Sequence, residues 1–204
     1  MWLLNPKIDR IVGIVAVLPF IYPLYRQLTS PALTLPRLAA ICSYVVLVST
    51  MVTRRPPVRV TTNPWYWILT FVASYGLLVP ALLPIPGVRL APIVLTNTLA
   101  VLGVAVMLYG RFSLGRNIGL LPAQRRLALG GAYRFVRHPI YTGNFVIFAS
   151  LILAALSPWT VLVVGILTGL FMLKSVVEER FLQGDPAYAA YMQRVRWRWF
   201  PWIA

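Results

Sequence analysis

Long apolar runs separated by short polar stretches set the pattern of this chain. Each run is predicted to be a membrane-crossing helix, because a span needs about 17–25 mostly apolar residues. The six runs cover residues 11–25, 38–52, 65–83, 90–110, 140–156 and 159–177. Some are short for a bilayer, so five spans remain the alternative. The predicted fold is an all-α, polytopic integral membrane bundle of about six transmembrane helices.

The last two runs are separated only by "SPW", which leaves room for a tight turn. We therefore predict a helical hairpin over 140–177. A polar stretch with six arginines, 111–139, precedes the hairpin, and an aromatic and basic tail follows it. We expect the polar loop and a C-terminal helix to close a pocket at one end of the bundle. Residues 1–110 would hold four helices and 111–204 the candidate site, within one structural domain.

Composition agrees with a membrane protein. Apolar residues make up 59% of the chain and charged residues 11%, against about a quarter charged in soluble domains. The net charge of +15 would suggest nucleic acid for a soluble protein. Here the basic residues are scattered among loops beside apolar runs, so we predict a lipid bilayer and no nucleic acid. Cys42 is the lone cysteine, which excludes an internal disulfide and a thiolate cluster; no metal site is predicted.

The basic residues also predict an orientation. With six spans, both termini share a side with the loops 53–64 and 111–139. That side carries 16 of the 19 lysines and arginines, and the other carries only Arg26, Arg37 and Arg89. Positive charge stays on the cytoplasmic side. We therefore expect a multi-pass protein of a bacterial inner membrane, with both termini and the candidate site cytoplasmic.

The only histidine lies where the polar loop meets an apolar run, in "VRHPIYTGN", residues 136–144. Pro139 disfavours helical geometry at the residue before it, so His138 is predicted at the mouth of a helix. A helix start offers unpaired N–H groups that suit an anionic ligand group. The alternative is that Arg134 and Arg137 only contact lipid phosphates at the membrane surface.

The chain has few carboxylates, and most of them lie close together in the sequence. Of four acidic residues, three follow the sixth run: Glu178, Glu179 and Asp185. The predicted hairpin returns them to the side of the histidine loop, so one pocket can gather both. Lys174 and Glu178 are four residues apart and can pair on one helix face. Neighbouring glutamates point about 100° apart, so one of the two has an even chance of being a solvated helix end.

These stretches carry a family resemblance. "LGRNIGLLPAQRRLALGGAYRFVRHPIYTGN", "VVEERFL" and "YAAYMQRV…FP" resemble the isoprenylcysteine carboxyl methyltransferase family, whose superfamily includes phospholipid N-methyltransferases. The resemblance covers about residues 110–203, and the first four segments carry no motif. It implies a site for S-adenosyl-L-methionine, with S-adenosyl-L-homocysteine as product. The implied cofactor-binding residues are Tyr133, Arg137, His138, Tyr141, Gly143, Glu178, Glu179, Tyr188, Tyr191 and Arg194, with Arg137 and Glu178 also catalytic.

Methyl transfer from a sulfonium needs little proton chemistry. A carboxylate or thiolate acceptor is already a nucleophile, so positioning and exclusion of water supply most of the catalysis. His138 is then expected to bind the cofactor rather than to act as a base. The predicted function is methyl transfer in the membrane to a lipophilic or small carboxylate, thiol or amine. The alternatives are an NADPH-dependent reductase of the sterol-reductase type and a non-catalytic accessory protein that retains the pocket.

Overall fold

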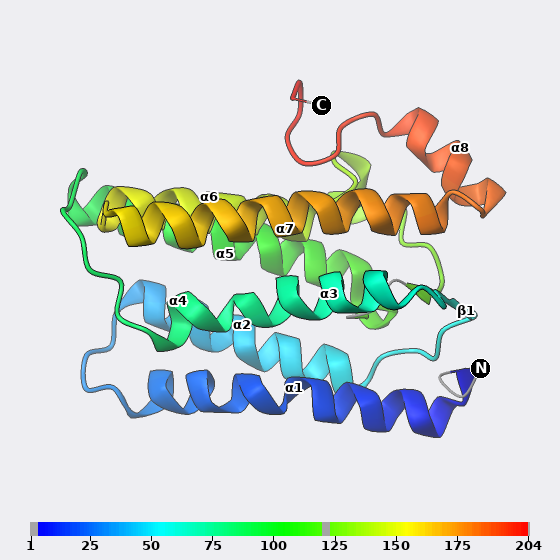
Figure 1. The fold of residues 1–204 in the computed structure, drawn as a ribbon, viewed down its shortest axis with the longest axis horizontal. Helices are drawn as coiled ribbons and strands as arrows, with labels where there is room; N and C mark the ends of the chain where they lie inside the picture. The colour runs from blue at the N-terminus through cyan, green and yellow to red at the C-terminus, as the bar shows by residue number, and fades with distance from the viewer. Residues whose placement is uncertain (1–3, 120–122, 204) are drawn as a thin grey trace.

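The computed structural model describes residues 4–119 and 123–203. Figure 1 shows a bundle whose helices run along one long axis. Within the described residues, six apolar helical segments build it: α1 (Pro6–Thr29), α2 (Leu35–Val52), α3 with α4 (Pro64–Gly76, Leu78–Leu82), α5 (Ile93–Leu114), α6 (Pro139–Ala154) and α7 (Pro158–Leu182). Five are long and apolar enough to cross a membrane, and α6 is shorter. The predicted all-α membrane bundle is confirmed.

Capping residues explain why several helices begin earlier than the apolar runs that predicted them. A polar side chain precedes each of α1, α2, α3 and α7 and accepts a hydrogen bond from a backbone N–H of the first turn. These capping residues are Asn5, Thr34, Asn63 and Ser157. A proline follows in the first turn of each helix, where its missing N–H costs little. The apolar pattern locates the middle of a helix, whereas the cap sets its start.

One end of the bundle, which we call the site end, gathers the start of α1, the loop 53–63, the described residues 115–119 and 123–138 of the next loop, and α8 (Pro186–Arg194) (Figure 1, right); the C-terminal segment runs back from α8 toward the middle of the bundle. There β1 (Arg59–Val60) pairs antiparallel with β2 (Ala123–Gln124) and joins the two loops. The short helices η2 (Gly115–Asn117) and η3 (Gly131–Arg134) lie in the second loop. The opposite end holds the remaining turns, two of which pair through Val88 and Leu156. The loops are therefore sorted between the two ends as the six-span prediction requires.

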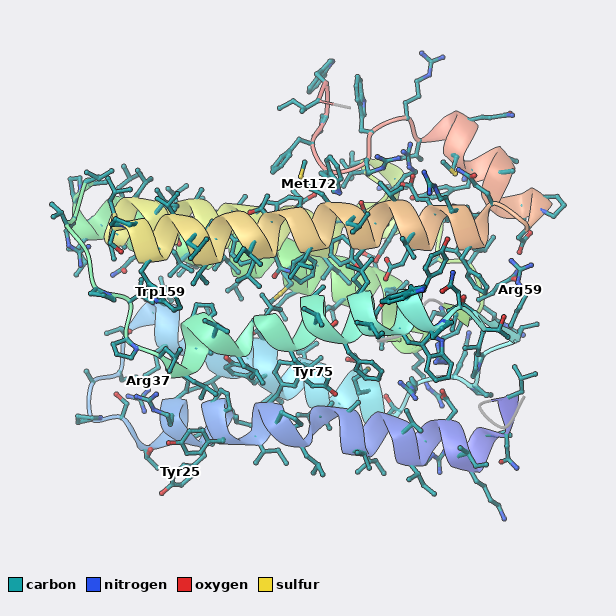
Figure 2. The ribbon with its side chains drawn as sticks, viewed as in Figure 1. Tyr25, Arg37, Arg59, Tyr75, Trp159 and Met172 are labelled. Carbon is teal, nitrogen blue, oxygen red and sulfur yellow. The ribbon has the colours of Figure 1, made fainter. Side chains whose placement is uncertain are left out.

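Arg59 and Arg37 mark these two ends (Figure 2). Arg37 is one of the few basic residues at the end opposite the site. It donates to the carbonyl oxygen of Leu28 at 3.2 Å and to the carbonyls of Gln27 and Ala32. Carbonyls at the end of a helix lack partners within the helix, and arginine satisfies them well. This arginine therefore closes the turn between α1 and α2.

α5 and α6 pack with their backbones in contact. A Cβ atom on Gly143 would lie 2.5 Å from the carbonyl oxygen of Gly103 and 2.6 Å from the backbone nitrogen of Met107. One on Gly110 would lie 3.0 Å from the backbone nitrogen of Ile140. Interiors are packed too densely to absorb such overlaps without movement. These glycines hold the start of α6 against the last turns of α5 and so place the histidine junction at the site end.

Candidate active site

A cavity opens among the helices at the site end. Its volume is about 230 Å³. One wall is polar and comes from the loop before α6 and from α6, α7 and α8; it includes Tyr133, His138, Tyr141, Glu178, Tyr188 and Tyr191. The other wall comes from α1, α2, α5 and the loop after α5; its apolar side chains, which give it its name here as the apolar wall, include Phe20, Leu47, Met51, Leu114 and Ile118. The site therefore has room for a ligand with a polar and an apolar part.

Glu179 is the most enclosed charge of the site end, with 1% of its surface exposed. Its carboxylate accepts hydrogen bonds from Arg137 Nε at 2.7 Å and from Arg198 Nη2 at 2.8 Å. His138 Nε2 lies 3.0 Å from its Oε1, so that nitrogen carries the donated proton. Both carboxylate oxygens therefore accept hydrogen bonds from cationic partners. These bonds offset the cost of removing the carboxylate from water.

The C-terminal segment is bound to the histidine junction. The backbone N–H groups of Arg137 and His138 donate to the carbonyl oxygens of Trp197 and Arg198, both at 2.9 Å. Arg137 Nη1 also donates to the carbonyl of Val195 at 2.9 Å. His138 has φ −128° and ψ 60°, which is not helical, so Pro139 opens α6 as predicted. This turn frees the N–H groups that bind the tail, and every nitrogen of the Arg137 guanidinium has a partner.

Glu178 lies on the cavity wall instead. Its two oxygens accept from the hydroxyl of Tyr141 at 2.9 and 2.8 Å. Lys174 Nζ lies 3.8 Å from Oε1, so the predicted pair four residues apart is present. The same ammonium donates to Ser74 Oγ at 3.2 Å. The two neighbouring glutamates therefore differ in their surroundings: Glu178 faces the cavity, and Glu179 faces the tail.

Three tyrosines complete the polar wall. Tyr191 donates from its hydroxyl to the carbonyl oxygen of Tyr133 at 2.8 Å, which fixes α8 to the loop before α6. The rings of Tyr188 and Tyr191 lie 5.6 Å apart. Burial raises the pKa of Tyr191 to about 12 and also raises the pKa of Tyr133 and of Tyr188. All three phenols therefore stay neutral and keep their protons for donation at physiological pH.

Seven of the ten residues that the resemblance implied line the cavity: Tyr133, Arg137, His138, Tyr141, Glu178, Tyr188 and Tyr191. The structure places three outside the lining. Gly143 packs against α5, Glu179 is enclosed behind the wall, and Arg194 is exposed at the end of α8. The motif residues gather around the cavity, but the motif does not separate side chains on the cavity surface from side chains that pack behind it.

The cavity also has charged and polar lining residues outside the ten implied ones: Ser74, Arg111, Asn117, Arg125, Arg126, Asn144 and Lys174. Asn117, Arg125, Arg126 and Asn144 lie within the stretch that carries the resemblance. For two others one signal was available, because a charged residue near membrane depth tends to be functional: Arg111 adjoins an apolar run and Lys174 lies inside one. Ser74 carries no such signal, because small polar residues in a membrane helix can also serve helix packing.

A second buried charge cluster ties α1 to the loops over the cavity. Asp9 Oδ1 lies 2.8 Å from Arg54 Nη2 and 3.2 Å from Arg125 Nη2. All three residues are buried, and Gly13 leaves room for the guanidinium of Arg54. Burial lowers the pKa of Arg125 to about 10, and Asp9 opposes that shift. Arg125 is therefore charged at neutral pH, and its ion pair with Asp9 fixes the loop 123–129 beside the cavity.

Metal ligands are not gathered at this site. Among the residues with a described position, no three histidine, cysteine or acidic side chains are grouped to hold a metal ion. The site end has a polar wall in which the carboxylate of Glu178 faces the cavity, an apolar wall, and a tail that is bound by the buried carboxylate of Glu179. Fold and site together define an integral membrane protein with a ligand pocket at one end of its helices.

A comparison with known families identifies the class of activity. Residues 90–185 match the family model described as phospholipid methyltransferase. The matched segment runs from the start of α5 through α7 and includes the histidine junction and both glutamates, so the resemblance to membrane methyltransferases is confirmed. No curated protein matches the chain. The segment 90–185 is similar to this family of methyltransferases, and α1–α4 and the tail after Asp185 lie outside the match.

Proposed function

We propose that the protein transfers a methyl group from S-adenosyl-L-methionine to a lipophilic acceptor at the membrane surface. The observation that carries this proposal is the two-sided cavity, in which a polar wall with Glu178 faces an apolar wall with Phe20 and Met51. Such a space suits a polar cofactor beside an acceptor that enters from the bilayer. The family match over 90–185 supports the reaction type.

The donor set fits the cofactor. A carboxylate is a good acceptor for an ammonium group or for ribose hydroxyls, and Glu178 is the acidic side chain among the described lining residues. The rings of Tyr133, Tyr188 and Tyr191 provide an apolar surface with polar edges for a nucleoside. Glu179 is enclosed behind the cavity wall, and Arg137 lines the cavity but has its guanidinium nitrogens bonded to Glu179 and to tail carbonyls, so both act as positioning residues in this proposal. His138 orients Glu179 and supports Tyr141, whose ring stacks on the imidazole at 5.2 Å.

When bound, the cofactor supplies a methyl group on a sulfonium, which the acceptor's lone pair takes in line while sulfur keeps the electrons of the broken bond. The protein's part is to bind, to orient and to keep water out. The tail and the loop 123–129 close the polar side of the cavity, and apolar side chains cover the other. Glu178 holds negative charge beside the position of a cationic ligand, which stabilises binding in a low-dielectric space.

The orientation follows the basic residues. We place the site end in the cytoplasm, because the positively charged loops gather there. A soluble cofactor then reaches the cavity from the aqueous side, and the acceptor reaches the apolar wall from the lipid side. Carboxylate, thiol and amine acceptors all remain within this proposal.

Calorimetry on the full chain in detergent tests the proposal. We expect S-adenosyl-L-homocysteine to bind, and Glu178→Gln to weaken that binding at least about tenfold, as loss of a charge-assisted hydrogen bond would. Arg180→Gln, an exposed position on the same helix, is the matched control and should bind normally. Binding of NADPH without any binding of S-adenosyl-L-homocysteine would overturn the proposal in favour of a reductase.

A further inference from the structure

Arg111 is a half-buried cation that lines the cavity, and no carboxylate among the described residues forms an ion pair with it. It lies in the last turn of α5 and lines the ligand space. Its Nε and Nη1 are buried and, in the part of the chain that the structure describes, have no hydrogen-bond partner. A charged N–H donor that is removed from water without gaining an acceptor destabilises the folded protein. Buried donors of this type in a native structure therefore indicate a missing partner. A bound ligand is one that the location suggests.

Lys174 is a second cation of the same cavity, on α7. It is 5% exposed, and its ammonium lies over the rings of Tyr141 and Phe171, at 5.5 and 5.8 Å from their centroids. Its nearest carboxylate oxygen belongs to Glu178, at 3.8 Å, a distance that exceeds a direct hydrogen bond. An ammonium has three protons, so besides the one donated to Ser74 it can still donate to a ligand.

The charges of the wall do not balance. Arg125 shares Asp9 with Arg54, Arg137 shares Glu179 with Arg198, and Lys174 is paired with Glu178. Arg126, the remaining cation besides Arg111, is exposed to solvent. Among the described lining residues, Arg111 therefore carries a positive charge inside the cavity that no ion pair compensates. A single anionic group would compensate it, and in a low-dielectric space that attraction is strong.

We propose that Arg111, assisted by Lys174, forms an oxyanion subsite that binds a carboxylate or phosphate group of a ligand of this cavity. The guanidinium fork matches the two oxygens of such a group, and an ammonium supplies a point charge beside it. Two ligands can carry the oxyanion: the cofactor, whose amino-acid end has a carboxylate, and an acceptor with an acidic head. The first source rests on the proposed function, whereas the second does not.

The subsite lies between the two walls. Arg111 and Leu114 are three residues apart on α5, so they share a face of that helix, and Leu114 belongs to the apolar wall. Gly110 holds the same turn against the start of α6, where the polar wall begins. An oxyanion bound by Arg111 is therefore at the junction where cofactor and acceptor meet. This position suits either source.

Three variants of the full chain test the subsite. Arg111→Gln removes the charge, Arg111→Lys keeps the charge without the fork, and Arg134→Gln removes an exposed arginine outside the cavity lining as a matched control. We expect the ligand-free Tm of Arg111→Gln to equal or exceed that of the wild type, because Nε and Nη1 donate no hydrogen bond to the described residues that the substitution could remove. A cation needed only for folding would give a lower Tm.

Two pairs of probes distinguish the sources. S-adenosyl-L-homocysteine is compared with its methyl ester, which keeps the ammonium but has a neutral carboxyl end. Hexadecyl phosphate is compared with hexadecanol in the same detergent, which has the same chain without the oxyanion. Binding is followed by calorimetry for the nucleosides and by the ligand-induced rise in Tm for the lipids.

If the cofactor is the source, Arg111→Gln weakens the binding of S-adenosyl-L-homocysteine at least about tenfold and leaves the binding of its methyl ester unchanged. Arg111→Lys then restores part of the lost affinity. If an acidic acceptor is the source, Arg111→Gln abolishes stabilisation by hexadecyl phosphate alone. Either result supports the subsite. Unchanged binding of both oxyanion probes by Arg111→Gln would overturn it. A wild type that binds no nucleoside would refute the proposed function, and the lipid arm would still decide the subsite.

Discussion

The neighbouring glutamates should respond differently to the same substitution. Glu179→Gln removes the charge that holds Arg137 and Arg198. Breaking a buried pair from one side costs about 3–5 kcal/mol. We take the lower end, about 3 kcal/mol, because glutamine keeps an acceptor oxygen and the Arg198 side chain is 27% exposed, which reduces its share. The tail should therefore open about a hundredfold more often, since each 1.4 kcal/mol is a factor of ten.

Limited trypsin digestion reads out that opening. Arg194, Arg196 and Arg198 are potential cleavage sites in the tail, and cleavage needs local opening of the backbone. Intact-mass spectrometry of Glu179→Gln should show fast loss of the C-terminal residues while the helices stay whole. Its Tm, followed by tryptophan fluorescence, should fall by about 6–12 °C, at roughly 2–4 °C per kcal/mol for a chain of this size.

Glu178→Gln is the matched variant. Glu178 contacts Tyr141, Lys174 and His138, and no hydrogen bond joins its side chain to the described tail residues. We expect tryptic release of the tail at the wild-type rate, together with weaker ligand binding. Equal acceleration of cleavage in both variants, or none in Glu179→Gln, would refute the division of labour between the two carboxylates.

Two further substitutions test the packing around the site. Gly143→Ala should lower the Tm by about 2–12 °C, because overpacking an interface costs about 1–3 kcal/mol. Gly169→Ala is the control and should leave the Tm unchanged, because its added methyl group meets no atom within 4 Å. Equal Tm values for the two variants would contradict the close contact of α5 with α6. Asp9→Asn should lower the Tm and weaken S-adenosyl-L-homocysteine binding, because it loosens the loop over the cavity. The control is Arg10→Gln at the exposed neighbouring position, which should change neither the Tm nor the binding. Normal ligand affinity in Asp9→Asn would show that the cluster of Asp9, Arg54 and Arg125 is only structural.

Much of the architecture follows from apolar run length alone. Runs of 15–21 residues in a chain with few charges leave little alternative to membrane helices. The placement of His138 at the start of α6 also follows from local rules, because Pro139 restricts the residue before it. The ends of the helices were less predictable. Asn5 and Thr34 start their helices several residues before the apolar runs, since a cap depends on one hydrogen bond rather than on hydropathy.

The site was predictable as a set of residues but not as a set of roles. The sequence places Glu178 and Glu179 about 100° apart on a helix without giving the rotation of α7 against α6. That rotation decides which carboxylate meets Arg137 and which meets the cavity. The same limit applies to Gly143, where the sequence shows a small residue in a motif and only the backbone of α5 shows why no side chain fits.

The helices that carry no motif are nonetheless part of the site. α1 contributes Phe20 to the apolar wall and Asp9 to the clamp on Arg125. α2 contributes Leu47 and Met51, and α3 contributes Ser74, which binds the ammonium of Lys174. The matched segment 90–185 supplies most of the polar wall but only part of the opposite one, including Leu114 and Ile118. A wall of apolar side chains can vary in sequence while keeping its size, so it leaves no motif. Under the proposed function the acceptor meets that wall, and its selection would then depend largely on the half of the chain that carries no motif.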